Sequence, residues 1–131
     1  MPEIETRFDA TAAAPRAARA FVRDALQTWQ LDGIGEITEI LAGELVANVV
    51  RHVGAPGTLR ASSEGRTLRV EVDDVNTEVP VVRRRGPNYA SGYGMLLVDE
   101  LANRWGVDCH PGGKTVWFEL DLPPGNDEPR T

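Results

Sequence analysis

Two polar side chains, Glu44 and Asn48, occupy positions where a helix is expected to be apolar. The segment 34–53 has the spacing of an amphipathic helix, and at about 100° per residue both side chains share a stripe with Ile37 and Leu41. This stripe is predicted to face the core, where an unpaired carboxylate or carboxamide is costly. We interpret the pair as lining a cleft, where their oxygen atoms suit Mg²⁺ together with phosphate oxygens. The alternatives are a wet helix edge, or a Glu44 that caps a neighbouring backbone.

Two further stretches could complete such a cleft. In the alternating segment 67–72, Val70 and Val72 share one face, and Asp74 continues that face inward where a long loop begins. The stretch SGYGM at 91–95 leads directly into an apolar helix, and glycines at a helix start let backbone N–H groups approach a phosphate. Taken singly, Asp74 is better explained as a solvated loop carboxylate, and a lone G-x-G before a helix is weak evidence for a phosphate site.

Basic residues occur at two places near these stretches. The run of arginines at 83–85 lies in the long loop and could reach phosphates, or it could be a solvated surface run. The block GGKTVWFEL at 112–120 places Lys114 and Thr115 at the start of a core strand, for which an ordinary hairpin turn is the alternative.

The elements that must position these residues follow from periodicity and from turn residues. We expect an edge strand at 3–8, helices at 13–29, 34–53 and 95–103, and hairpins formed by 58–62 with 67–72 and by 105–109 with 115–120. The fold class is therefore predicted to be α+β, a two-layer sandwich of a mixed, mostly antiparallel sheet with three helices on one face. Residues 1–122 are expected to form one domain, followed by a disordered polar tail at 123–131.

Composition excludes several classes of function. The sequence of 131 residues carries a net charge of −6, which argues against a general nucleic-acid binder. Its one cysteine, Cys109, excludes an internal disulfide and a cysteine-rich zinc site. We find no apolar run of transmembrane length and no secretion signal, so the sequence predicts a cytoplasmic protein without direct membrane contact.

Four blocks, taken in order, resemble the histidine-kinase-like (GHKL) ATPases, and most closely the small stand-alone serine/threonine kinases that act as anti-sigma factors in bacteria. The blocks are ELVANVVRH at 44–52, VEVDD at 70–74 followed by Pro80, GYGMLLVDELANRWGV at 92–107, and GGKTVWFEL at 112–120. The resemblance spans about residues 5–120 and implies the Bergerat-type ATPase fold with ATP and Mg²⁺ as cofactors.

The resemblance also implies roles for single residues. Glu44 would be the catalytic general base, and Asn48 would hold the Mg²⁺ ion that bridges the ATP phosphates. Asp74 would accept a hydrogen bond from the adenine amino group, with Thr115 supporting it. Asn76 would stand at a glycine position of the first glycine box.

The second glycine box and the loop before it would contact the phosphates. Gly92, Gly94 and Met95 match that box, and Arg85 is the loop arginine expected to reach the phosphates. The first box departs from the family pattern D-x-G-x-G, because Glu78 also replaces a glycine. Its negative charge is expected to weaken nucleotide binding.

Two functions remain in competition at this stage. The first is an anti-sigma-type kinase that transfers the ATP γ-phosphoryl to a serine or threonine of an anti-sigma-factor antagonist, or sequesters a sigma factor. The second is a non-catalytic protein-binding module of the same fold, in which nucleotide binding is weak or absent. In both cases the expected partner is a protein rather than DNA, and a homodimer is possible.

Overall fold

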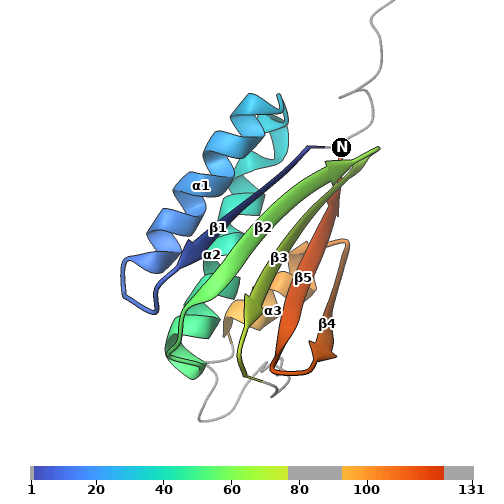
Figure 1. The fold of residues 1–131 in the computed structure, drawn as a ribbon. Coiled ribbons are helices and arrows are strands. Elements are labelled where there is room, and N and C mark those ends of the chain that lie inside the picture. Colours follow the sequence, from blue (N-terminus) through green and yellow to red (C-terminus); the bar gives the residue numbers. More distant parts are fainter. Residues whose placement is uncertain (1, 77–92, 123–131) are drawn as a thin grey trace, which may run out of the picture.

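The computed structural model describes residues 2–76 and 93–122. The elements in chain order are β1 (Glu3–Phe8), α1 (Ala14–Thr28), the short 3-10 helix η1 (Asp32–Ile34), α2 (Gly35–His52), β2 (Gly57–Glu64), β3 (Thr67–Asp74), α3 (Tyr93–Leu101), β4 (Arg104–His110) and β5 (Gly113–Asp121). Within this part of the chain the three α-helices lie on one face of a single sheet (Figure 1). The predicted α+β two-layer sandwich is confirmed.

The sheet has the strand order β1-β2-β3-β5-β4, and every neighbouring pair is antiparallel. Both predicted hairpins are present as β2–β3 and β4–β5. The sequence did not predict that β3 would pair with β5, which makes β3 the central strand. That pairing sets which residues of the two strands lie opposite each other.

One face of strand β3 packs into the core, since its side chains alternate regularly between buried and half-buried. Leu68, Val70 and Val72 are at most 1% exposed and face the helices. Asp74 continues the same face and is also buried, as the alternation predicted. A carboxylate therefore stands at the end of an otherwise apolar row.

Helix α1 packs along α2 and carries most of its apolar side chains on one face. Val22 and Leu26 of α1 are each 1% exposed. A Cβ atom added at Gly43 of α2 would lie 3.0 Å from a guanidinium nitrogen of Arg19, so the glycine leaves room for that side chain. Packing against α1 therefore fixes which face of α2 is turned toward the sheet.

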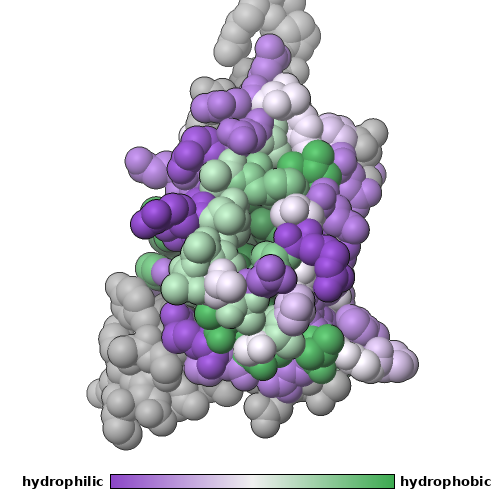
Figure 2. Space-filling model, turned by 60° about the vertical axis from the view of Figure 1, so that its left-hand side comes forward, coloured by the Kyte–Doolittle hydropathy of each residue, from purple (hydrophilic) through white to green (hydrophobic). Residues whose placement is uncertain are grey.

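The side of the molecule that carries α1 and β1 exposes mostly weakly hydrophobic residues, with a few smaller patches of strongly hydrophobic ones (Figure 2). Figure 2 shows a pale green band between purple, hydrophilic rows on this side. The large hydrophobic residues that are exposed in the described part are Ile40, Val75 and Leu101, which belong to different segments. The possible homodimer therefore stays an expectation. No helix among the described residues is long and apolar enough to span a bilayer.

Candidate nucleotide site

The fold brings the second half of α2 and the end of β3 to the same end of the sheet. A short turn joins the end of α2 to the start of β2, where Thr58 pairs with Asp73 near the end of β3. The C-terminal ends of α2, which carries Glu44 and Asn48, and of β3, which ends at Asp74, both lie at the lower end of the sheet in Figure 1. Helix α3 begins in the same part of the structure. Three of the predicted site residues therefore come from two elements that the sheet topology brings together.

Asp74 forms a buried ion pair with Lys114. The lysine Nζ atom lies 2.9 Å from Asp74 Oδ1, and the two side chains are 2% and 6% exposed, with the aspartate the more buried. Asp74 and Lys114 are directly opposite each other in the β3–β5 ladder, so both side chains point to the helix-covered face. Sequence reasoning placed Lys114 at the start of a core strand, with a hairpin turn as the alternative, and did not predict this pair. The pair could have been found from the alternation of β5. Lys114 lies two residues before Val116, which faces the core, so the same alternation places Lys114 inward.

The backbone around this pair is closely packed. The amide N–H of Asn76 donates to Asp74 Oδ1 at 2.8 Å, and Lys114 Nζ donates to the carbonyl oxygen of Asn76 at 3.0 Å. A Cβ atom added at Gly113 would lie 2.1 Å from the carbonyl oxygen of Asp74. Among the described residues the non-glycine with positive φ is Gln30, so Asn76 does not use the left-handed geometry open to a glycine. The hydrogen bonds fix the turn instead.

Glu44 and Asn48 are half-buried at the edge of the core stripe, which corrects the expectation that they are buried within it. The buried stripe of α2 is centred on Leu41, Leu45 and Val49, and it is turned away from the predicted one. The physical reason is that the sheet covers a broad face of α2, and the two polar residues flank that face. A half-buried position removes most of the desolvation cost and leaves both side chains accessible to a ligand.

Asn48 already has a partner. The Arg51 guanidinium donates to Asn48 Oδ1 at 3.0 Å. Among the described residues no group of three or more His, Cys, Asp or Glu side chains could hold a metal ion. A Mg²⁺ ion at this helix would therefore depend on Asn48, Glu44 and ligands brought by a nucleotide.

Thr115 lies on the opposite face of the sheet from Asp74. Its hydroxyl donates to Asp73 Oδ1 at 2.6 Å, and His110 Nε2 lies 3.2 Å from the same hydroxyl oxygen. The expectation that Thr115 supports the adenine beside Asp74 does not agree with this geometry. The reason is the register: Thr115 pairs with Asp73, and Lys114 pairs with Asp74.

The remaining predicted contacts lie at or beyond the limits of the described residues. Arg85, Glu78 and Gly92 are outside the described residues, as is the expected tail at 123–131. Gly94 lies in the first turn of α3. Met95 is 2% exposed and packs in the hydrophobic core, so its side chain serves the core rather than an open cleft.

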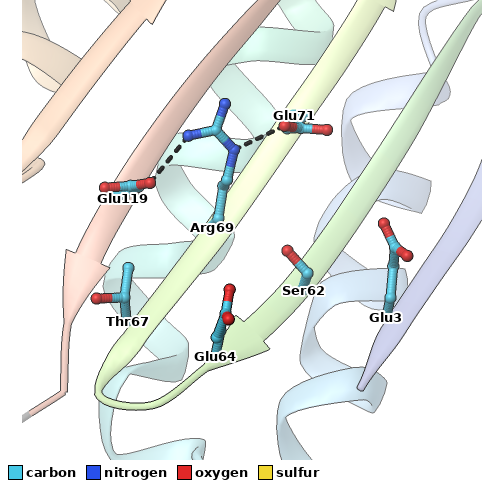
Figure 3. Close-up of a pocket in the computed structure, with 7 residues that line it drawn as sticks. All are labelled: Glu3, Ser62, Glu64, Thr67, Arg69, Glu71 and Glu119. Carbon is cyan, nitrogen blue, oxygen red and sulfur yellow. Dashed lines mark hydrogen bonds and ion pairs between the residues drawn. The ribbon is translucent and has the colours of Figure 1, made fainter. Parts of the chain in front are cut away.

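The outer face of the sheet carries a network of arginines and carboxylates that sequence reasoning did not predict. Arg69 bonds Glu71 at 2.6 Å and Glu119 at 2.9 Å (Figure 3), and its guanidinium lies 4.2 Å from the centre of the Trp117 ring. The Arg104 bond holds the pKa of Glu119 below its usual value, and Arg69 adds to this. The pocket on this face is lined by Arg69 and four glutamates, two of which, Glu71 and Glu119, pair with Arg69.

Comparisons with known proteins agree with this architecture. Residues 8–120 match the family model described as "Histidine kinase-like ATPase domain". The chain belongs to the histidine kinase-like ATPase family, and its fold is that of kinase-type, ATP-binding domains. A comparison with curated protein sequences found no match.

Two solved structures define the fold further. One is the crystal structure of the RsbU and RsbW domains of Rv1364c from Mycobacterium tuberculosis, with a TM-score of 0.71 and 21% identity over 93% of this chain. The match spans 33% of that chain, so the similarity concerns one part of a longer protein. The other is the histidine kinase domain of the blue-light activated histidine kinase EL346 from Erythrobacter litoralis. Its TM-score is 0.52 at 21% identity, covering 93% of this chain and 70% of that one.

Proposed function

We propose that this protein is an ATP- and Mg²⁺-dependent regulatory kinase of the anti-sigma type. It transfers the γ-phosphoryl group to a serine or threonine of an anti-sigma-factor antagonist, and it can also sequester a sigma factor. The observation that carries the proposal is the buried Asp74 at the end of β3, at the end of the sheet where α2, the helix of Glu44 and Asn48, also ends. The family match and the similarity to an RsbW domain support it.

The residues present fit the expected cofactors. Asp74 offers a carboxylate to the base, Asn48 a carboxamide oxygen to Mg²⁺, and Glu44 a carboxylate to the hydroxyl of the partner protein. Bound ATP and Mg²⁺ would supply the phosphoryl group and neutralise the charge that develops on it. Glu44 orients the attacking hydroxyl and accepts its proton, and its half-buried position on α2 leaves it accessible for this.

Transfer of label from γ-³²P-ATP to a purified antagonist protein tests this role. The Glu44→Gln variant keeps the shape of the side chain and removes the base, so we expect transfer to fall about 100-fold or more. Glu36→Gln changes an exposed glutamate in the first turn of the same helix and serves as the control. Equal transfer by wild type and Glu44→Gln would show that Glu44 is not the base.

A second function is favoured by two specific contacts. Arg51 bonds Asn48 Oδ1, and Lys114 bonds Asp74 Oδ1, so groups expected to hold the nucleotide have internal partners. A non-catalytic binding module would have this property. It predicts no phosphoryl transfer and a partner affinity that is the same with and without ATP–Mg²⁺, whereas the kinase predicts transfer and a nucleotide-dependent affinity.

A further inference from the structure

Lys114 is the only lysine in the sequence, in which the other basic residues are arginines. Its side chain is 6% exposed and stands at the end of β3, beside the carboxylate expected to meet the base of a nucleotide. A buried ammonium needs hydrogen-bond partners for its charge, and Asp74 and the carbonyl of Asn76 supply two. The position of this lysine therefore bears on what the site can recognise.

The pair has hydrogen-bonding capacity beyond its internal contacts. An ammonium has three N–H donors, and in the described part of the chain two of them have partners. Asp74 receives Lys114 and the N–H of Asn76 on the same oxygen, Oδ1. A carboxylate accepts on both oxygens, so Oδ2 adds acceptor capacity. Counted over residues 2–76 and 93–122, the pair thus has one donor and one acceptor oxygen beyond its internal contacts.

We propose that the pair Lys114–Asp74 allows the site to bind 6-oxopurine nucleotides, whose base is guanine or hypoxanthine, as well as adenine nucleotides. This inference rests on the proposed nucleotide site. The O6 atom of a 6-oxopurine accepts from Lys114, and its N1–H donates to Asp74. Adenine uses the same pair with the two positions exchanged: its 6-amino group donates to Asp74, and its N1 atom accepts from Lys114.

Lys114 determines whether the site can bind 6-oxopurines in addition to adenine. A carboxylate alone is only an acceptor, so it would repel the O6 atom of a 6-oxopurine and select for adenine. Lys114 supplies the missing donor, and its positive charge offsets the negative charge of Asp74. An ammonium suits this position because its three donors diverge from one point, whereas a guanidinium is planar and larger.

Calorimetric titration of the wild-type protein with the Mg²⁺ complexes of ATP, GTP, ITP and CTP tests the proposal. We expect GTP and ITP to bind within about tenfold of ATP, and CTP, which lacks the purine, to bind more weakly. Binding of ATP with GTP and ITP more than tenfold weaker would overturn the inference and leave the proposed function intact. Failure of all four nucleotides to bind would instead contradict the proposed function.

A variant tests the role of the lysine itself. Lys114→Met removes the donor, and we expect the ratio of the GTP to the ATP dissociation constant to rise at least tenfold. Arg69→Met removes a cation from the other face of the same strands and should leave that ratio unchanged. An unchanged ratio in Lys114→Met would overturn the inference.

A measurement on the wild-type chain covers the case in which Lys114→Met does not fold. With ¹⁵N-lysine labelling, the sole side-chain ammonium gives one signal in the NMR spectrum. Saturation with GTP or ITP is expected to shift this signal as strongly as ATP does. A signal that moves with ATP and stays in place at GTP saturation would overturn the inference.

Discussion

The two faces of the sheet hold their charges in different ways. On the outer face Arg60, Arg69 and Arg104 each bond two or more carboxylates, and their side chains are 22–48% exposed. On the helix-covered face, Asp74 and Lys114 form one pair that is almost fully buried. Exposed ion pairs contribute about 0–1 kcal/mol each, whereas removal of one partner of a buried pair costs about 3–5 kcal/mol.

This difference indicates where function is expected. The arginines and carboxylates of the outer face are paired within a shared, partly exposed network, as expected of a hydrated surface. Within the described part of the chain, the buried pair bonds only the backbone of Asn76 besides itself, and it stands at the end of a core row that an apolar residue could have completed. A costly pair at the end of a strand is more readily explained by ligand recognition than by stability. The following predictions test that contrast.

The largest effect is expected at the buried pair. Lys114→Met leaves the Asp74 carboxylate without its cation, and we expect the free energy of unfolding to fall by about 3–5 kcal/mol. Urea denaturation followed by circular dichroism measures this. The double variant Asp74→Leu/Lys114→Met should recover most of the loss because it removes both charges. A loss no larger than that of Arg69→Met would contradict the contrast between the faces.

A smaller effect is expected from backbone contact at the same pair. Gly113→Ala would place a Cβ atom 2.1 Å from the carbonyl oxygen of Asp74, which forces β5 away from the end of β3. We expect a loss of about 1–3 kcal/mol in the free energy of unfolding. Gly106→Ala, at 2.7 Å from the Trp117 ring of the outer face, should cost less because a side chain can move. Thermal denaturation compares the two, and the reverse order would count against tight packing at the pair.

A still smaller effect is expected on the outer face. Arg69→Met breaks the bonds to Glu71 and Glu119, and we expect a loss of about 0.5–1 kcal/mol that diminishes as salt concentration rises. The same urea titration at low and high ionic strength measures it. A loss above 3 kcal/mol that does not depend on salt would show that this network is as consequential as the buried pair.

The smallest effect concerns acid stability. Hydrogen bonding to Arg104 keeps the pKa of Glu119 below its usual value in the folded protein, so its ionised form stabilises the fold above the unfolded pKa, near 4.5. That contribution is lost as pH falls through the lowered, folded-state pKa. Glu119→Gln is expected to flatten the fall in stability between about pH 5 and pH 3. Superimposable stability–pH curves for variant and wild type would contradict this.

Much of this fold could be predicted from the sequence because local patterns determine it. The alternation of Val70 and Val72 placed Asp74 inward, and the apolar periodicity of the helices gave their approximate bounds. The order of the strands depends on contacts between segments far apart, which local patterns do not encode.

The site was predicted less well than the fold, for physical reasons. The resemblance implied that Thr115 supports Asp74, whereas the register pairs Thr115 with Asp73 and Lys114 with Asp74, and one residue of register exchanges the two faces of a strand. Similarly, the width of the buried face of α2 depends on the sheet beneath it, so Asn48 was placed in the core rather than at its edge.

The central claim is that this chain binds ATP–Mg²⁺ through Asp74, and calorimetry tests it most directly. We predict saturable heat of binding at millimolar ATP–Mg²⁺ for the wild-type protein, and an affinity at least tenfold lower for Asp74→Asn. The thermal transition of the variant serves as the check on its folding. No heat and no thermal shift from the wild-type protein at millimolar ATP–Mg²⁺ would contradict the account and favour the non-catalytic binding module.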